Sequence, residues 1–323
     1  MKTQILLVEM SRVIGVFSGK GGVGKTTLVA NLGAALSNGF HKNVVIFDNN
    51  IHSSHLGLHF GLYEDFPVTL REVLKKRIPI MQAIFIHPAT GTRIIPAPLN
   101  GTDLDMTKEK CCAMIDQVKR NYDMVVLDCA PGLGKEVLVP MQSVDEAIVI
   151  STADIAAVTD AMKTIELLKK FKKNVLGLVI NRYRNQKYEL TPQEISSTAN
   201  YNIIGVIPED SKVPDSIAKG MPAVISHPHS KASLAFKRLA AFLINEPYKE
   251  ESMLEKLKAL FNFRLPTVSK RGVEPVVQQQ QIMRKEVSDV VELKEVLTED
   301  IKEELKREIM KRVRERLKER MHG

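Results

Sequence analysis

A glycine-rich segment between an apolar run and a helical run constrains the fold of this chain more than any other feature. Residues 19–26 match the pattern Gly-x-x-x-x-Gly-Lys-Ser/Thr, and the apolar run Val13–Phe17 precedes them directly. Glycines let the backbone curl so that successive N–H groups point inward, and a following helix turns its positive end toward the same space. A strand, this loop and a helix in that order predict a phosphate-binding loop.

The loop residues have separate expected tasks. Lys25 is expected to neutralise charge on the β- and γ-phosphates of a nucleotide, and the Thr26 hydroxyl is expected to bind Mg²⁺. The other residues expected to surround the phosphates are Gly21, Gly22, Val23, Gly24 and Thr27.

The region from residue 12 to about residue 245 alternates short Val- and Ile-rich runs with helical patterns, which indicates repeated βα units. Most runs are apolar at consecutive positions, as expected for strands covered on both faces. The seven expected strands are Val13–Phe17, Val44–Asp48, Arg93–Pro96, Met124–Asp128, Ala147–Ile150, Leu176–Ile180 and Ile203–Ile207. They predict one α/β domain, residues 1–245, with a doubly wound, mostly parallel sheet whose first helix is Thr26–Ser37.

The chain changes character after this domain. Residues 246–263 contain one short amphipathic pattern, Leu254–Phe263, and are expected to form an accessory helix. Residues 264–286 carry prolines, a glycine and a run of glutamines, which favours a linker. Residues 287–323 have no proline and no glycine before the last position, so they predict a helical tail.

Composition excludes some classes of protein. No run of about 18 uncharged apolar residues occurs, so no segment is expected to span a bilayer. The first ten residues have only four consecutive apolar positions before Glu9, fewer than a signal peptide requires, and the expected location is the cytoplasm. The net charge of +8 permits attraction to nucleic acid or to an anionic membrane without choosing between them.

The first lysine of the loop adds information that an ordinary phosphate-binding loop lacks. Lys20–Thr26 reads Lys-Gly-Gly-Val-Gly-Lys-Thr, which resembles the deviant Walker A motif of the MinD/ParA superfamily of P-loop ATPases. In that family the first lysine reaches across a two-fold interface to the nucleotide of the other subunit. The resemblance implies that Lys20 acts much as an arginine finger does, and that ATP hydrolysis depends on a homodimer.

Two strand ends extend the resemblance to the adenine side of the site. Asn181 and Arg182 resemble the family's strand-end pair, whose amide meets the adenine edge with a donor and an acceptor. Pro208, Glu209 and Asp210 match the segment that wraps the other side of the base in MinD proteins. The resemblance therefore implies ATP, with Mg²⁺, as the cofactor.

The expected Mg²⁺ site follows the family pattern with one departure. Asp128 ends an apolar strand and opens Asp-Cys-Ala-Pro-Gly, which resembles the family's switch II and implies a carboxylate near the metal. After the second strand the family reads Asp-x-Asp, and this chain reads Asp48-Asn49-Asn50. Asp48 keeps the carboxylate expected near Mg²⁺, whereas an amide replaces the one expected near the attacking water.

The amide at position 50 lowers the rate of ATP hydrolysis that we expect. Asn50 is nearly isosteric with aspartate, but it cannot accept a proton or supply negative charge. We therefore expect ATP binding to be retained and hydrolysis to be slowed. Natural divergence and a deliberate substitution that traps the ATP-bound state both account for it. The expected catalytic residues are Lys20, Lys25, Asn50 and Asp128.

The tail carries an apolar residue at every fourth position. Over Ile309–Met321 these residues form one helix face, and lysine and arginine dominate the rest. Such a helix is typical of a peripheral membrane anchor, and a dimer would double it. A helix–helix contact and a solvated helix are the alternatives, and the tail lacks the aromatic residues common in interfacial anchors.

Together these features predict an ATPase switch that positions a cellular assembly. ATP closes the dimer, the dimer binds a surface and a partner, and slow hydrolysis, stimulated by an activating protein, disperses it. A ParA-like protein that uses DNA as its surface is one alternative. A scaffold that holds ATP with little hydrolysis is another, which a native Asn50 favours. A metal-insertion ATPase is disfavoured because the superfamily's iron–sulfur carriers use a Cys-x-x-Cys pair that this chain lacks.

Overall fold

The structure is a computed structural model of the 323-residue chain. It describes residues 11–248, apart from residues 52–53, 63–65, 67, 77 and 99–103. The chain divides into two units, Met1–Glu250 and Glu251–Gly323, and the described residues all belong to the first. The predictions for the accessory helix beyond residue 248, the linker and the tail therefore lie outside the described residues.

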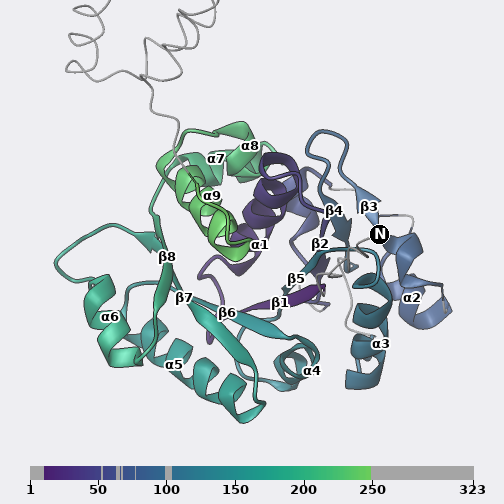
Figure 1. Ribbon diagram of the computed structural model, residues 1–323, viewed down its shortest axis with the longest axis horizontal. Helices are drawn as coiled ribbons and strands as arrows, with labels where there is room; N and C mark the ends of the chain where they lie inside the picture. Colours follow the sequence, from purple (N-terminus) through teal and green to yellow (C-terminus); the bar gives the residue numbers. More distant parts are fainter. Residues whose placement is uncertain are drawn as a thin grey trace, which may run out of the picture. The chain divides into compact units, whose positions relative to one another are not determined.

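An eight-stranded sheet forms the centre of the first unit (Figure 1). The strands are β1 (Arg12–Phe17), β2 (Val44–Asp48), β3 (Phe85–Ile86), β4 (Arg93–Ile95), β5 (Met124–Asp128), β6 (Glu146–Ser151), β7 (Asn174–Tyr183) and β8 (Ile203–Pro208). Their order is β3-β4-β2-β5-β1-β6-β7-β8, and every neighbouring pair is parallel except β3 and β4. The prediction of a doubly wound, mostly parallel sheet is confirmed, and β3 is an additional strand too short to leave a pattern in the sequence.

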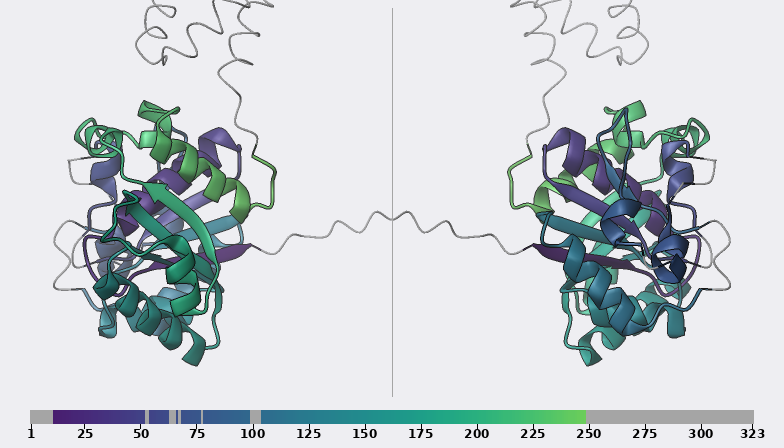
Figure 2. Two further views of the ribbon diagram at one scale, coloured as in Figure 1. Left: turned by 90° about the vertical axis from the view of Figure 1, so that its left-hand side faces the viewer. Right: turned by 90° about the vertical axis from the view of Figure 1, so that its right-hand side faces the viewer.

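Helices cover both faces of this sheet (Figure 2). One face carries α1 (Lys25–Ala34), α7 (Lys212–Ala218), α8 (Ala223–Ser226) and α9 (Lys231–Leu243), with the 3₁₀ helix η2 (Gly57–Phe60). The other carries α2 (Leu70–Lys76), η3 (Ile80–Ala83), α3 (Lys108–Val118), α4 (Lys135–Ser143), α5 (Ile155–Lys170) and α6 (Pro192–Ala199). Among the described residues, no helix combines the length and the apolar character needed to cross a bilayer.

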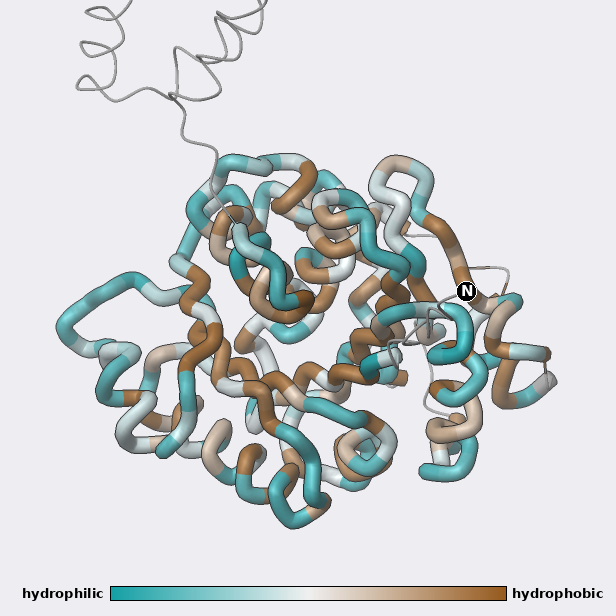
Figure 3. The backbone as a smooth tube through the Cα atoms, viewed as in Figure 1, coloured by the Kyte–Doolittle hydropathy of each residue, from teal (hydrophilic) through white to brown (hydrophobic). Residues whose placement is uncertain are grey.

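The central strands contribute to two hydrophobic cores because successive side chains point to opposite faces. In β1, Val13 and Phe17 belong to the core beneath α3, α4 and α5, whereas Ile14 and Val16 belong to the core beneath α1 and α9. Figure 3 shows these apolar strands between the two helical layers. Burial of each such side chain contributes about 1.5–3 kcal/mol, so covering both faces fixes the strand order.

The first helix differs from its predicted extent. The α-helix ends at Ala34, and its chain continues as a π-helical turn, η1 (Ala35–Gly39). The Phe40 N–H donates to the Ala35 carbonyl across that wider turn at 3.0 Å. The amino end of α1, which faces the glycine-rich loop, begins one residue earlier than predicted.

Candidate nucleotide-binding site

The loop between β1 and α1 has the conformation that the glycine motif predicts. Gly22 and Gly24 have φ values of 78° and 99°, in the left-handed region that glycine adopts without strain. The Ser18 hydroxyl donates to the Lys20 carbonyl at 2.7 Å and closes the start of the turn. Lys25 then opens α1, so the positive end of the helix adjoins the loop.

Asn181 holds this loop from across the sheet. Its Nδ2 donates to the Val23 carbonyl at 2.7 Å, and the side chain is buried. A Cβ atom at Gly24 would lie 2.2 Å from the same Nδ2, so glycine is required there for space as well as for conformation. The structure therefore brings Asn181 to the phosphate loop, while its contact with adenine stays a prediction.

Lys25 and Asp128 face one another inside the site. The lysine side chain is buried, and burial lowers the pKa of Lys25 although Asp128 attracts its charged form. Burial raises the pKa of Asp128, and the attraction of Lys25 opposes that shift. Both carboxylate oxygens of Asp128 are buried without a hydrogen-bond partner in the described part of the chain. This carboxylate is therefore available for a cation and its water shell.

Asp48 lies beside Asp128 because β2 and β5 are paired in register at these two residues. Unlike Asp128, it accepts three hydrogen bonds: from the Asn50 N–H at 3.1 Å, the Ser54 hydroxyl at 2.6 Å and the Leu56 N–H at 3.4 Å. Burial, and then the neighbouring Asp128, raise the pKa of Asp48. The two carboxylates thus meet as predicted, with different surroundings.

The first lysine of the motif lies apart from the second. The Lys20 ammonium pairs with Asp154 Oδ1 at 3.0 Å, and both side chains are partly exposed. Asp154 also caps α5 by accepting from the Ala157 N–H at 2.9 Å. Lys25 is buried among the loop and the carboxylates, whereas Lys20 lies at the surface beside the start of α5.

The residues predicted to surround adenine lie at the ends of β7 and β8. Arg182 is exposed with a φ of 56°, and Glu209 forms a surface ion pair with Arg184 at 3.5 Å. Asp210 accepts from the Lys212 and Ala232 N–H groups at 2.9 Å and 3.0 Å, so its carboxylate organises the start of α7 and α9. Pro208 ends β8 beside them.

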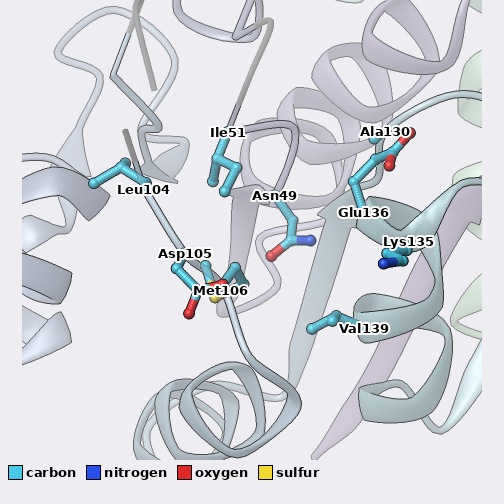
Figure 4. Close-up of a pocket in the computed structure, with 9 residues that line it drawn as sticks. All are labelled: Asn49, Ile51, Leu104, Asp105, Met106, Ala130, Lys135, Glu136 and Val139. Atoms are coloured by element: carbon cyan, nitrogen blue, oxygen red, sulfur yellow. The ribbon is translucent and has the colours of Figure 1, made fainter. Parts of the chain in front are cut away.

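A cavity of about 220 Å³ adjoins the carboxylates (Figure 4). Asn49, which directly follows Asp48, and Ala130, two residues after Asp128, form part of its lining together with Leu104 and Val139. Figure 4 shows the Asn49 amide projecting into this cavity from the end of β2. The cavity therefore shares backbone with both acidic residues of the site.

Sequence reasoning missed two residues of the site. Asp154 binds Lys20 across 134 positions of sequence, and the sequence signals it only as a helix-capping residue after β6. Ser54 binds Asp48, and no motif marks a serine at that position. The first contact depends on which strands are neighbours, and the second depends on the local course of the chain after β2; sequence spacing alone specifies neither.

Comparison with known proteins agrees with this geometry. The ParA family model, described as NUBPL iron-transfer P-loop NTPase, matches residues 9–244. An uncharacterized ATP-binding protein of Methanocaldococcus jannaschii is 36% identical over 267 residues, which cover 80% of this chain and 100% of that protein. The septum site-determining protein MinD of Synechocystis is 32% identical over 236 residues, which cover 72% of this chain and 88% of that protein.

A solved structure supports the same relationship. The septum site-determining protein MinD of Pyrococcus horikoshii, complexed with Mg-ADP, is similar to this chain with a TM-score of 0.68 and 32% identity. The match covers 72% of this chain and 96% of that one. The fold, the loop with its two lysines and the paired carboxylates agree with these similarities, and the chain belongs to the MinD/ParA superfamily of P-loop ATPases.

Proposed function

We propose that this chain is a nucleotide-gated switch whose homodimer is closed by ATP with Mg²⁺ and opened by hydrolysis. Its relatives include MinD proteins that determine the septum site, which supports a role in positioning a cellular assembly. The observation that carries the proposal is the separation of the two lysines of the loop. One is buried at the phosphate cradle, and the other is presented at the surface.

Lys20 can leave its ion pair with Asp154 with little loss of free energy. Its ion pair with Asp154 joins side chains that are 37% and 50% exposed. A pair of this kind contributes about 0–1 kcal/mol, because water screens the charges and both side chains lose freedom. The lysine can therefore exchange Asp154 for a more highly charged phosphate group offered by a second subunit.

The surface around Lys20 also carries apolar side chains. Ile155, which follows Asp154 directly, is 71% exposed, and Leu133 is 40% exposed. Leu133 belongs to the segment after Asp128, whose Gly132 N–H donates to the Ser18 carbonyl at the start of the loop at 3.0 Å. Burial of both side chains would add a hydrophobic contribution to a dimer that closes over the nucleotide.

Mg²⁺ fits the donors of this site. Two unpartnered, buried oxygens on Asp128 supply the hard ligands that Mg²⁺ and its water shell prefer. We assign Thr26, Asp48 and Asp128 to this shell, and Lys25 to the phosphates. Bound Mg²⁺ would neutralise part of the phosphate charge, while the chain's own groups orient the nucleotide.

We expect hydrolysis to be slow and stimulated by an activating protein, and the amide at position 50 should slow it further. Asn50 donates its backbone N–H to Asp48, so the substitution of its side chain leaves that part of the loop intact. A scaffold that holds ATP is the second candidate function, and Asn50 is the observation that favours it. Such a scaffold would remain dimeric with ATP for as long as nucleotide is present.

The dimer is tested by chromatography with light scattering in ADP and in ATP. We expect monomers in ADP and dimers in ATP, and we expect Lys20→Ala to remain monomeric in both. Lys163→Ala is a matched control, because Lys163 is another partly exposed lysine paired with an aspartate, Asp160, at 3.1 Å. Monomers of the unaltered protein in ATP would refute the switch, and a Lys20→Ala dimer that persists would favour the scaffold.

The surface that the dimer binds is tested separately. We propose a peripheral membrane surface or a helical protein partner, reached from the cytoplasm through residues 287–323. Sedimentation with anionic vesicles in ATP alone, abolished by removal of residues 297–323, would support the membrane. DNA binding that falls steeply with salt would instead support the ParA-like alternative. Sedimentation that is equal in ADP and ATP would contradict nucleotide gating.

A further inference from the structure

The carboxylate of Asp48 is one of the groups that fasten the segment after β2 to the site. Asp48 Oδ1 accepts from the Asn50 N–H, and Asp48 Oδ2 accepts from the Ser54 hydroxyl and the Leu56 N–H. We call these four groups the Asp48 clasp. The clasp connects the last residue of β2 to positions two, six and eight residues further along the chain.

Ser54 makes the shortest contact of the clasp. Its hydroxyl lies 2.6 Å from Asp48 Oδ2, a short O–H···O hydrogen bond, whereas the Leu56 N–H lies at 3.4 Å. Asp48 is 0% exposed and Ser54 is 6% exposed, so water cannot replace the hydroxyl without entering the core. A buried acceptor that loses its main donor costs free energy.

The count of acceptor positions shows what the clasp leaves free. An ionised carboxylate has about four lone-pair positions, two on each oxygen. Ser54 and Leu56 occupy those of Oδ2, and Asn50 occupies one of those of Oδ1. One position on Oδ1 is left for a further donor, such as a water molecule of the proposed Mg²⁺ shell.

We propose that Ser54 is a positioning residue that acts through Asp48: its hydroxyl fixes the carboxylate and holds the segment after β2 in register with the nucleotide site. This inference rests on the proposed function for its effect on hydrolysis. The contact itself concerns this chain's own residues. Because Asn50 takes part through its backbone N–H, the clasp is compatible with either residue, asparagine or aspartate, at position 50.

The test compares Ser54→Ala with Ser54→Thr, which retains the hydroxyl. Ser216→Ala is the matched control, because Ser216 is also buried and donates its hydroxyl at 2.7 Å, to the Val213 carbonyl in α7. The first readout is hydrogen exchange of the Leu56 amide in the full-length chain without nucleotide. We expect exchange to be about tenfold faster in Ser54→Ala, because a buried hydrogen bond that fixes the acceptor of the Leu56 N–H is lost. Ser54→Thr and Ser216→Ala should exchange as the unaltered chain does.

The second readout separates binding from chemistry. Single-turnover hydrolysis should fall about tenfold in Ser54→Ala, while ATP affinity stays within about twofold, because the phosphate loop is unchanged. Ser54→Thr should restore the rate. A general loss of stability would instead lower affinity and rate together and would also appear in the thermal midpoint.

A failure of the Asp48 clasp can be distinguished from a failure of the proposed nucleotide-gated switch. If Leu56 exchanges equally in all variants, the clasp is refuted, whatever the protein does with ATP. If the unaltered chain binds no ATP, the proposed function fails, and Leu56 exchange still decides whether Ser54 holds the segment. If Ser54→Ala does not fold, Ser54→Cys, a weaker donor of similar size, should give intermediate exchange, and exchange equal to that of serine would overturn the proposal.

Discussion

The phosphate loop and the segment after β2 lie at neighbouring strand ends and are held in different ways. The loop between β1 and α1 is fixed from several directions, by Ser18, by the Gly132 N–H and by Asn181 from β7. The segment after β2 is held to the site through the Asp48 clasp. The comparison indicates a phosphate receptor fixed by several elements beside a segment in which the carboxylate of Asp48 joins three positions of the same stretch of chain.

The largest loss of ATP affinity is expected when a side chain is added at Gly24 of the phosphate loop. Gly24→Ala would place a Cβ atom 2.2 Å from Asn181 Nδ2 at a φ of 99°. Strain and collision together should weaken ATP binding by about 100-fold or more, measured with a fluorescent ATP analogue. Gly22→Ala is the control, because its φ is also positive, at 78°, but no atom lies within 4 Å of the added Cβ. Equal losses in the two variants would show that Asn181 does not constrain the loop.

A smaller loss of ATP affinity is expected when the hydrogen bond from Asn181 to the loop is removed. Asn181→Ala takes the donor away from the Val23 carbonyl, and ATP binding should weaken about tenfold. If Asn181 acts only on the loop, affinity for GTP should fall by the same factor. A loss of discrimination between ATP and GTP would instead show that the amide reads the adenine edge.

Asn50→Asp tests the other side of the comparison, the segment after β2. The carboxylate should raise single-turnover ATP hydrolysis several-fold and leave ATP affinity unchanged, because the phosphate loop is not altered. Asn49→Asp is a suitable control, since this neighbouring amide lines the adjoining cavity. An unchanged rate in Asn50→Asp would show that residue 50 takes no part in catalysis.

The smallest effect is expected on the thermal stability of the protein and on how that stability depends on pH. Burial raises the pKa of Asp128, so the folded state favours the protonated carboxyl and loses stability as pH rises through that raised pKa. Without Mg²⁺, Asp128→Asn should therefore unfold a few degrees above the unaltered protein at pH 8, and the difference should shrink toward pH 4. Mg²⁺ with ATP should also shrink it. A less stable variant at pH 8 would show instead that the attraction between Asp128 and the buried Lys25 outweighs the cost of burying the carboxylate.

Much of the fold could be predicted because its signals are local. Consecutive apolar residues marked seven strands, and the glycine motif located the loop before any contact was known. The paired aspartates were also predictable, because each directly ends an apolar strand.

The contacts that arrange the site could not be predicted. Lys20 meets Asp154 because β1 and β6 are neighbours, and Asn181 meets Val23 because β7 ends at the same edge of the sheet. Strand order decides these contacts, and no spacing in the sequence encodes it. Ser54 went unnoticed for another reason, because a serine in a polar loop is chemically ordinary until its one buried acceptor is known.

The hold of Asn181 on Val23 has a consequence for how this chain would respond to the cell. A loop that is already formed has little conformational freedom to lose when nucleotide arrives, so association needs no slow rearrangement. The backbone N–H groups of such a loop cradle the phosphates that ADP and ATP share. Occupancy should therefore follow the concentration ratio of the two nucleotides. The state of the switch would then report the energy charge of the cell as much as the presence of its partner.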